Sequence, residues 1–203
     1  ITIFWFRRDL RLSDNCALYH ALKENKRVLP LFIFDSEILQ NLDSEDARIE
    51  FIYRQIIRLK KDLENLGSSL VVLYGEPTKM LHQFTEQFHV VRLYFSRDYE
   101  PYARERDEQV ISLMERKNVE VKTFKDQVIF EKNEILKKDG KPYTVFTPYS
   151  KKWKEKLGDS VPARYPVREL ATHFYTTGPL DLPSVESMGF RLKNRSFPPV
   201  EPD

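Results

Sequence analysis

The sequence has a single cysteine, Cys16, among its 203 residues, so no disulfide can form within the chain. A lone thiol is typical of proteins from a reducing compartment, and we expect a cytoplasmic location. No apolar run approaches the length of a membrane span. The four histidines are scattered, and together with one cysteine they show no metal-ligand spacing. These absences argue against a disulfide-rich, membrane-spanning or metal-dependent protein.

The chain also lacks an excess of either charge. Its 33 lysines and arginines nearly balance 31 aspartates and glutamates, which leaves a net charge of +2. A strongly basic footprint for nucleic acid is therefore missing over the chain as a whole, so we do not expect this chain to be the main DNA-binding part of a protein.

Glycine is scarce too, with six residues, and the phosphate-binding glycine motifs are absent. No Gly-x-Gly-x-x-Gly follows the first apolar run, and no Gly-x-x-x-x-Gly-Lys-Ser/Thr occurs anywhere. The sequence therefore does not predict a nicotinamide dinucleotide site or a P-loop.

Short apolar runs alternate with amphipathic stretches over the first 124 residues. The runs predict strands at 2–6, 28–34, 70–74, 90–95 and 120–124, and the stretches between them predict helices at 15–23, 47–66, 77–88 and 103–117. Strands that alternate with helices indicate an α/β fold: a doubly wound, Rossmann-like parallel sheet of five strands in the order 3-2-1-4-5. Asp14 or Asn15 is expected to cap the first helix, and Asp43 or Ser44 the long one.

Two charged clusters follow the first and fourth predicted strands. One contains Arg7, Arg8, Asp9 and Arg11, and the other contains Arg97, Asp98 and Glu100. Strands one and four are neighbours in the predicted order, and the strand order reverses between them. The two clusters should therefore meet around one crevice at the carboxyl edge of the sheet. Asp35 ends the second strand at the same edge. The alternative is that these charges only pair with one another, with Asp9 bound to an arginine to hold its loop.

Three further features concern charged or aromatic side chains on predicted helices. Arg48 lies in the first turn of a helix, where the dipole disfavours cations, so it needs a carboxylate or an anionic ligand nearby unless it is simply solvated. Arg104, Arg106 and Asp107 are expected to form ion pairs on the solvated face of their helix. Phe146, Tyr149, Trp153 and Leu157 can share one helical face, with Thr147 as cap and Pro148 in the first position, and such a stripe is usually core.

Four segments of the sequence together resemble the photolyase/cryptochrome family. They are residues 5–18, 98–107, 143–149 with Trp153 after them, and 182–190. The resemblance keeps the order of the segments and covers essentially all of the chain, but only the amino-terminal α/β half of the family. It implies an antenna-chromophore domain over residues 1–157 and a proline-rich interdomain linker over 158–203. The helical half, which binds FAD in that family, would be missing here.

The resemblance also implies a ligand for the charged crevice. The α/β half of that family binds a light-harvesting chromophore, which is a folate, a deazaflavin or FMN. Folate users place an acidic residue where this chain has Ala103, whereas the pattern Asp98-x-Glu100-Pro101-Tyr102 is closer to the deazaflavin type. Deazaflavin or FMN is therefore favoured over folate, with Arg7, Asp35, Arg48, Asp98 and Glu100 as candidate contacts.

The function implied by the resemblance is that of a deoxyribodipyrimidine photolyase, a lyase that uses light and reduced FAD to split pyrimidine dimers. The fragment alone is not expected to repair DNA, and it would meet damaged DNA only through the full-length protein. Two alternatives stay open: the amino-terminal domain of a signalling cryptochrome, and a non-photoactive nucleotide-binding module on the same sheet.

Overall fold

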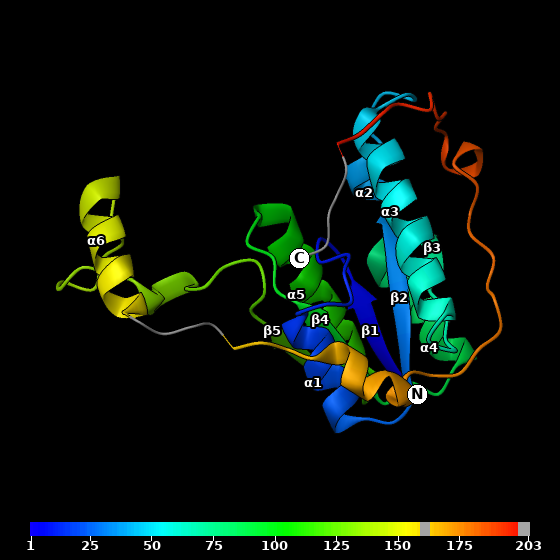
Figure 1. Cartoon of the computed structure of the whole chain (residues 1–203), viewed down its shortest axis with the longest axis horizontal. Helices are drawn as coiled ribbons and strands as arrows, with labels where there is room; N and C mark the ends of the chain where they lie inside the picture. Colours follow the sequence, from blue (N-terminus) through cyan, green and yellow to red (C-terminus); the bar gives the residue numbers. More distant parts are fainter. Residues whose placement is uncertain (159–162, 199–203) are drawn as a thin grey trace.

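The computed structural model describes residues 1–158 and 163–198, so the predicted linker, 158–203, is described only in part. Strands and helices alternate as far as residue 124 and short helices follow (Figure 1). The elements are β1 (Thr2–Phe6), α1 (Cys16–Glu24), β2 (Val28–Asp35), α2 (Ser36–Leu39), α3 (Ala47–Glu64), β3 (Val71–Gly75), α4 (Pro77–Gln87), β4 (Arg92–Ser96), α5 (Pro101–Arg116), β5 (Glu120–Phe124), η1 (Lys132–Glu134), α6 (Phe146–Leu157), η2 (Val167–His173) and η3 (Glu186–Met188).

The five strands form one parallel sheet in the order β3-β2-β1-β4-β5, which confirms the prediction. β1 lies in the middle, where Phe6 is opposite Phe32 of β2 and Phe4 is opposite Tyr94 of β4. Pro30 lacks an amide hydrogen, yet it lies inside β2 because β3 pairs with β2 only from Leu31 onward. β2 and β3 lie on one side of β1, and β4 and β5 lie on its other side, so the strand order reverses between β1 and β4. This reversal places a switch point at the carboxyl ends of these two strands.

Helices cover both faces of the sheet, and each face has its own core. On one face Phe4 and Phe6 of β1 pack with residues of α1 and α3. On the other face Ile3 and Trp5 pack with residues of α4 and α5. Successive side chains of a strand point to opposite faces, so every residue of β1 is buried, as in the central strand of a covered parallel sheet.

The helix boundaries follow local capping chemistry. The side chain of Asn15 accepts the amide hydrogen of Leu18 and so caps α1, as predicted. The prediction for α3 was wrong, because Asp46 rather than Asp43 or Ser44 accepts the first free amide, that of Arg48. The backbone amide of Asp46 itself binds the carbonyl of Asp43, so a turn separates the predicted cap from the helix.

Helix α6 does not belong to the core of the described residues, which corrects the prediction for its aromatic stripe. It begins at Phe146 with Val145 as cap, ahead of the predicted Thr147, and none of its residues is buried. Phe146 is 77% exposed, and Trp153 packs edge-on against the ring of Phe130. Figure 1 shows α6 standing away from the sheet. The predicted helix is therefore present, but its apolar face packs only against nearby residues such as Phe130 and not into the core of the described residues.

The segment after α6 packs closely against the α/β fold. Its apolar side chains Val167, Phe174, Met188 and Phe190 are buried in the core shared by α1 and α3. Phe174 forms a parallel bridge with Val28 at the start of β2, and the chain then runs along α3 (Figure 1). The sequence showed no periodicity here because the buried residues are supplied by irregular chain and two short 3-10 helices. No helix among the described residues is long and apolar enough to cross a membrane.

Candidate functional site

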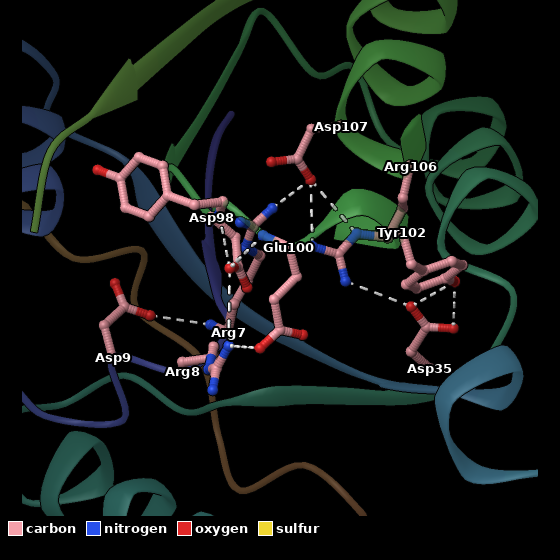
Figure 2. A network of polar contacts seen from close by, with 10 residues as sticks. Arg7, Arg8, Asp9, Asp35, Asp98, Glu100, Tyr102, Arg106 and Asp107 are labelled. Atoms are coloured by element: carbon pink, nitrogen blue, oxygen red, sulfur yellow. Dashed lines mark hydrogen bonds and ion pairs between the residues drawn. The ribbon is translucent and has the colours of Figure 1, made fainter. Parts of the chain in front are cut away.

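The two charged clusters meet at the carboxyl edge of the sheet, as the predicted strand order requires. Arg8, which follows β1, binds Glu100 at 2.7 Å and lies 3.6 Å from Asp98, and both carboxylates follow β4. Figure 2 shows these residues together with the end of β2 and the first turns of α5. We refer to the following set as the polar network: Arg7, Arg8, Asp9, Asp35, Asp98, Glu100, Tyr102, Arg106 and Asp107.

Asp9 organises the loop after β1 through neutral partners. Its carboxylate accepts the backbone amide of Arg7 at 2.9 Å and the hydroxyl of Ser96 at 2.8 Å, and Asn15 donates to it at 3.3 Å. Ser96 ends β4, so one buried aspartate joins two strand ends and the cap of α1. Asp9 therefore holds its loop, as the alternative of a purely structural role predicted. It does so through a backbone amide and a hydroxyl rather than through an arginine side chain.

A buried chain of ion pairs runs from β1 through α5 to β2. The guanidinium of Arg7 binds the carboxylate of Asp107, which also binds Arg106 at 3.1 Å. Arg106 also binds Asp35 at 3.3 Å, and Asp35 accepts a hydrogen bond from the hydroxyl of Tyr102 at 2.8 Å. The prediction that Arg106 and Asp107 lie on a solvated face was wrong, because both are buried under the turns at the sheet edge. Arg104 on the same helix is exposed.

Aromatic rings flank the two buried guanidiniums. Arg7 lies 5.2 Å from the ring centre of Trp5 and 5.0 Å from that of Phe95. Arg106 lies 5.2 Å from the ring of Trp5 on the same strand face. Such cation–π contacts contribute about 2 kcal/mol when the cation is desolvated. The rings thus allow two cations to lie close together in the interior, with the carboxylate of Asp107 between them.

Arg7 is the least satisfied polar group of the described residues. Its side chain is 6% exposed, and its Nε and Nη2 atoms are buried without a hydrogen-bond partner. Burial lowers the pKa of Arg7, and the neighbouring charge of Asp107 acts in the opposite direction. Buried donors normally have partners, and an orphaned one costs about 1–3 kcal/mol. Two donors on one buried guanidinium thus lack an acceptor among the described residues.

The outer layer of the polar network is more exposed and more acidic. Asp98 is itself largely buried, and its carboxylate accepts the amide hydrogen of Tyr99 at 2.7 Å. Glu100 hydrogen-bonds Arg8 and so raises the pKa of that guanidinium. Hydrogen bonding to Asp35 and burial raise the pKa of the Tyr102 phenol, with burial the larger cause. The edge thus places the guanidiniums of Arg7 and Arg8 near the carboxylates of Asp98 and Glu100.

Arg48 forms no hydrogen bond or ion pair with the polar network among the contacts of the described residues. Its side chain is 69% exposed, and its hydrogen bonds within the described chain all go to Asp46, the cap of its own helix. The hydrogen bonds from Arg48 lower the pKa of Asp46 to about 2. A carboxylate nearby therefore accounts for the cation in the first turn of α3.

The structure brings Arg7, Asp35, Asp98 and Glu100 to one edge, and it adds Arg8, Tyr102, Arg106 and Asp107. Of the added residues, Arg106 and Asp107 could have been found from their spacing: they follow the buried Ala103 by three and four residues, which places them on the same side of α5. A cavity of about 280 Å³ adjoins Arg106 and Tyr102 between α2, α4 and α5.

Comparison with known proteins identifies the family. The model of the family described as DNA photolyase matches residues 2–167. The chain belongs to the DNA photolyase family. The match covers the whole sheet, the polar network and α6, so the photolyase fold accounts for every element that forms the candidate site.

Several curated relatives share this part of their sequence. A deoxyribodipyrimidine photo-lyase of Synechococcus sp. (strain PCC 6301) is 34% identical over 151 residues, which are 74% of this chain and 31% of that protein. An uncharacterized 31.6 kDa protein of Synechococcus sp. (strain PCC 6716) is 30% identical over 93% of this chain and 66% of its own length. The chain thus spans between about a third and two thirds of the length of these relatives.

Solved photolyase structures share the fold. An archaeal photolyase from Sulfolobus tokodaii, described as holding two FAD molecules and implying a novel light-harvesting cofactor, matches with a TM-score of 0.65 and 27% identity. The match covers 85% of this chain and 41% of that one. A class III photolyase from Agrobacterium tumefaciens matches with a TM-score of 0.71 and 26% identity over 92% of this chain and 37% of its own. A cryptochrome from Synechocystis shares the fold at 20% identity and a TM-score of 0.75 over 94% of this chain and 40% of its own.

Proposed function

We propose that this chain is the light-harvesting domain of a deoxyribodipyrimidine photolyase and that the polar network helps to hold a flat antenna chromophore. The bound chromophore would absorb light and pass its energy to FAD in a second, helical domain, where pyrimidine dimers in DNA are split. The relatives that are named photo-lyases and the two photolyase structures above 25% identity support this assignment.

The observation that carries the proposal is the pair of orphaned donors on buried Arg7. They lie at the switch point of the sheet, where doubly wound folds bind ligands. Asp98 supplies acceptors at the same edge, close enough to contribute to the electrostatics of Arg7. A deazaflavin or flavin ring has carbonyl oxygens that accept hydrogen bonds and an imide N–H that donates one. The residues present therefore fit such a ring.

The roles of the individual residues follow from their burial. Arg7 would donate to a ring acceptor and Asp98 would accept from a ring donor. Asp35 would act indirectly, because its carboxylate is already bound by Arg106 and Tyr102. Glu100 would shield the edge from water through its ion pair with Arg8. Arg48 would contact the ring by exchanging Asp46 for the ligand, since its guanidinium is 69% exposed.

The rest of the proposed protein would cover surfaces that this chain leaves open. The exposed ring of Phe146 and the half-buried aromatic residues of α6 would pack against the FAD-binding domain, which would account for an apolar stripe outside the core. The near-neutral charge of the chain fits a module that leaves DNA binding to that domain. We place the protein in the cytoplasm, in keeping with its single buried, unpaired thiol.

Titration with FMN, a deazaflavin and a folate tests the chromophore assignment. We expect the flavin-type rings to bind and the folate to bind at least tenfold more weakly, because Ala103 supplies no carboxylate to a pterin. Equal or tighter folate binding would contradict the choice of chromophore. Absence of binding by all three compounds would contradict the site itself.

Photorepair by the full-length protein tests the enzymatic part. With reduced FAD, ultraviolet-damaged DNA and blue light, we expect dimers to be split, and an added antenna chromophore should raise the rate at wavelengths that it absorbs. A full-length protein that binds FAD and responds to light without repairing dimers would indicate a signalling photoreceptor instead.

A further inference from the structure

A groove of about 820 Å³ lies on the face of the molecule covered by α1 and α3. Its walls are the loop after β1, the middle of α3 and the chain that leads into η2. Among the residues that line it, none belongs to the polar network. This volume is within the range of about 300–1,000 Å³ typical of small-molecule sites.

Arginines dominate the lining of this groove, which we call the arginine groove. Its charged residues are Arg11, Arg58, Arg164 and Arg168, against Asp14 and Asp62. Arg11 is held by a bidentate ion pair with Asp126 and by the carbonyl of Asp14. The side chains of Arg164 and Arg168 are different, because within the described residues neither has a carboxylate partner, although both are exposed. Two guanidiniums without a carboxylate partner among the described residues therefore line one groove.

Apolar and aromatic groups form the floor between these charges. Leu12 and Leu59 are buried, and the ring of Tyr165 packs 5.6 Å from that of Tyr19. A hydrogen bond with Cys16, with burial as a second cause, raises the pKa of Tyr165 to about 12, so its phenol stays neutral. The backbone amide of Tyr165 binds the Asp14 carboxylate at 3.0 Å, which fixes the loop after β1 against the chain before η2. This hydrogen bond joins two of the segments that line the groove.

We propose that the arginine groove binds a nucleotide, with its phosphates on Arg164 and Arg168 and its base against the apolar floor. Guanidiniums are planar, permanently charged and matched to phosphate oxygens, so two of them without carboxylates form a phosphate site. The apolar floor offers a stacking surface that a bare anion would not need. Asp62 of α3, which also lines the groove, can accept hydrogen bonds from ribose hydroxyls. This site is separate from the proposed chromophore site and does not depend on it.

Calorimetric titration of the full chain with ATP at physiological salt tests the proposal. Three proteins are compared: the wild type, Arg164→Gln/Arg168→Gln, and the control Arg104→Gln/Arg191→Gln, which removes the same charge from exposed positions elsewhere. We expect the groove variant to bind ATP at least tenfold more weakly and the control to bind like the wild type. No ATP binding by the wild type, or equal weakening in both variants, would overturn the proposal.

Two further arms separate the groove from simpler explanations. Tripolyphosphate should bind more weakly than ATP, and an equal affinity would overturn the assignment to a nucleotide because the base would then contribute nothing. The variant Asp98→Ala should bind ATP like the wild type, since Asp98 does not line the groove. A loss of ATP binding in that variant would place the nucleotide at the sheet edge and overturn the separate site.

Discussion

The guanidinium of Arg7 binds the carboxylate of Asp107, a hundred residues further along the chain, and both side chains are buried beneath the carboxyl edge of the sheet. This contact joins the end of the central strand to α5 on the far side of the switch point. It also leaves two nitrogens of the guanidinium without partners. The same pair therefore joins two distant parts of the fold and includes the guanidinium on which the proposed chromophore site depends.

Asp107→Ala should destabilise the protein strongly. Asp107 neutralises both Arg7 and Arg106, and its removal leaves buried positive charge uncompensated. Breaking a buried ion pair in this way costs about 3–5 kcal/mol, which urea unfolding would measure. Glu155→Ala removes an exposed partner of Lys152 and should change the unfolding free energy little. Equal effects of the two substitutions would show that Asp107 is not required for charge balance.

Asp98→Ala should weaken binding of FMN or a deazaflavin at least tenfold, which corresponds to about 1.4 kcal/mol. Trp5 packs against Arg7, so its emission should fall when a ring binds, and Trp153→Phe leaves Trp5 as the only tryptophan. Asp139→Ala, in an exposed turn, is the matched control. An affinity unchanged by Asp98→Ala would remove this residue from the site.

Arg48→Ala tests whether Arg48 takes part in binding the chromophore. If the guanidinium leaves Asp46 to bind the ring, the substitution should weaken FMN binding several-fold in the same fluorescence titration. Arg104→Ala, an exposed arginine on α5, controls for the change in net charge. Identical affinities in the two variants would show that Arg48 only caps its own helix.

Glu50→Gln should release the chain near Arg195 from α3. The buried Glu50 carboxylate accepts the backbone amides of Lys193 at 3.1 Å and Arg195 at 2.7 Å. Burial alone would raise its pKa, but these amides and the charge of Arg54 outweigh burial and hold the pKa below its ordinary value. The contact is therefore complete above the ordinary glutamate pKa of about 4.3 and is lost as the pH falls through the lower native value.

Trypsin at pH 8 would detect the release, because it should cleave after Lys193 and Arg195 faster in Glu50→Gln than in the wild type. Glu45→Gln is the control, since Glu45 binds Lys193 only at the exposed surface. Amide resonances of residues 191–195 should shift in the wild type on acidification below pH 4. Equal cleavage of both variants would contradict the clamp at Glu50.

Phe146→Ala should leave the unfolding free energy of this chain within about 0.5 kcal/mol of the wild type, because the ring is already exposed. Phe95→Ala, in contrast, empties a packed position in the sheet and should cost about 3–5 kcal/mol. Urea unfolding of the two variants gives the comparison. A large loss from Phe146→Ala would mean that α6 packs against the rest of the chain after all.

The sheet was predictable because its signals are local. Apolar runs bounded by Gly, Pro and charged residues set the strands, and chain order with right-handed crossovers then leaves few topologies. Convergence of the clusters around Arg7 and Asp98 followed from that order. The burial of Arg106 was not predicted, because the groups that offset the cost of burying its charge are recognisable only in the folded chain. Asp35 and Trp5 lie on other elements, and Asp107 is the next residue of the same helix.

The aromatic spacing of α6 predicted a helix correctly but could not say where its apolar face is covered. Periodicity reports that a face is apolar, not which surface meets it. The chain from Val167 to Phe190 gave the opposite error. Its prolines and irregular spacing hid side chains that complete the core, since periodicity is lost where buried residues come from irregular backbone.

The bridge between Phe174 and Val28 has a consequence for how such a protein can be divided. A version that stopped after α6 would expose the apolar ends of α1 and β2 to water and would lose the amides that surround Glu50. Recombination between related genes would therefore preserve this α/β domain only when the crossover falls beyond Arg195.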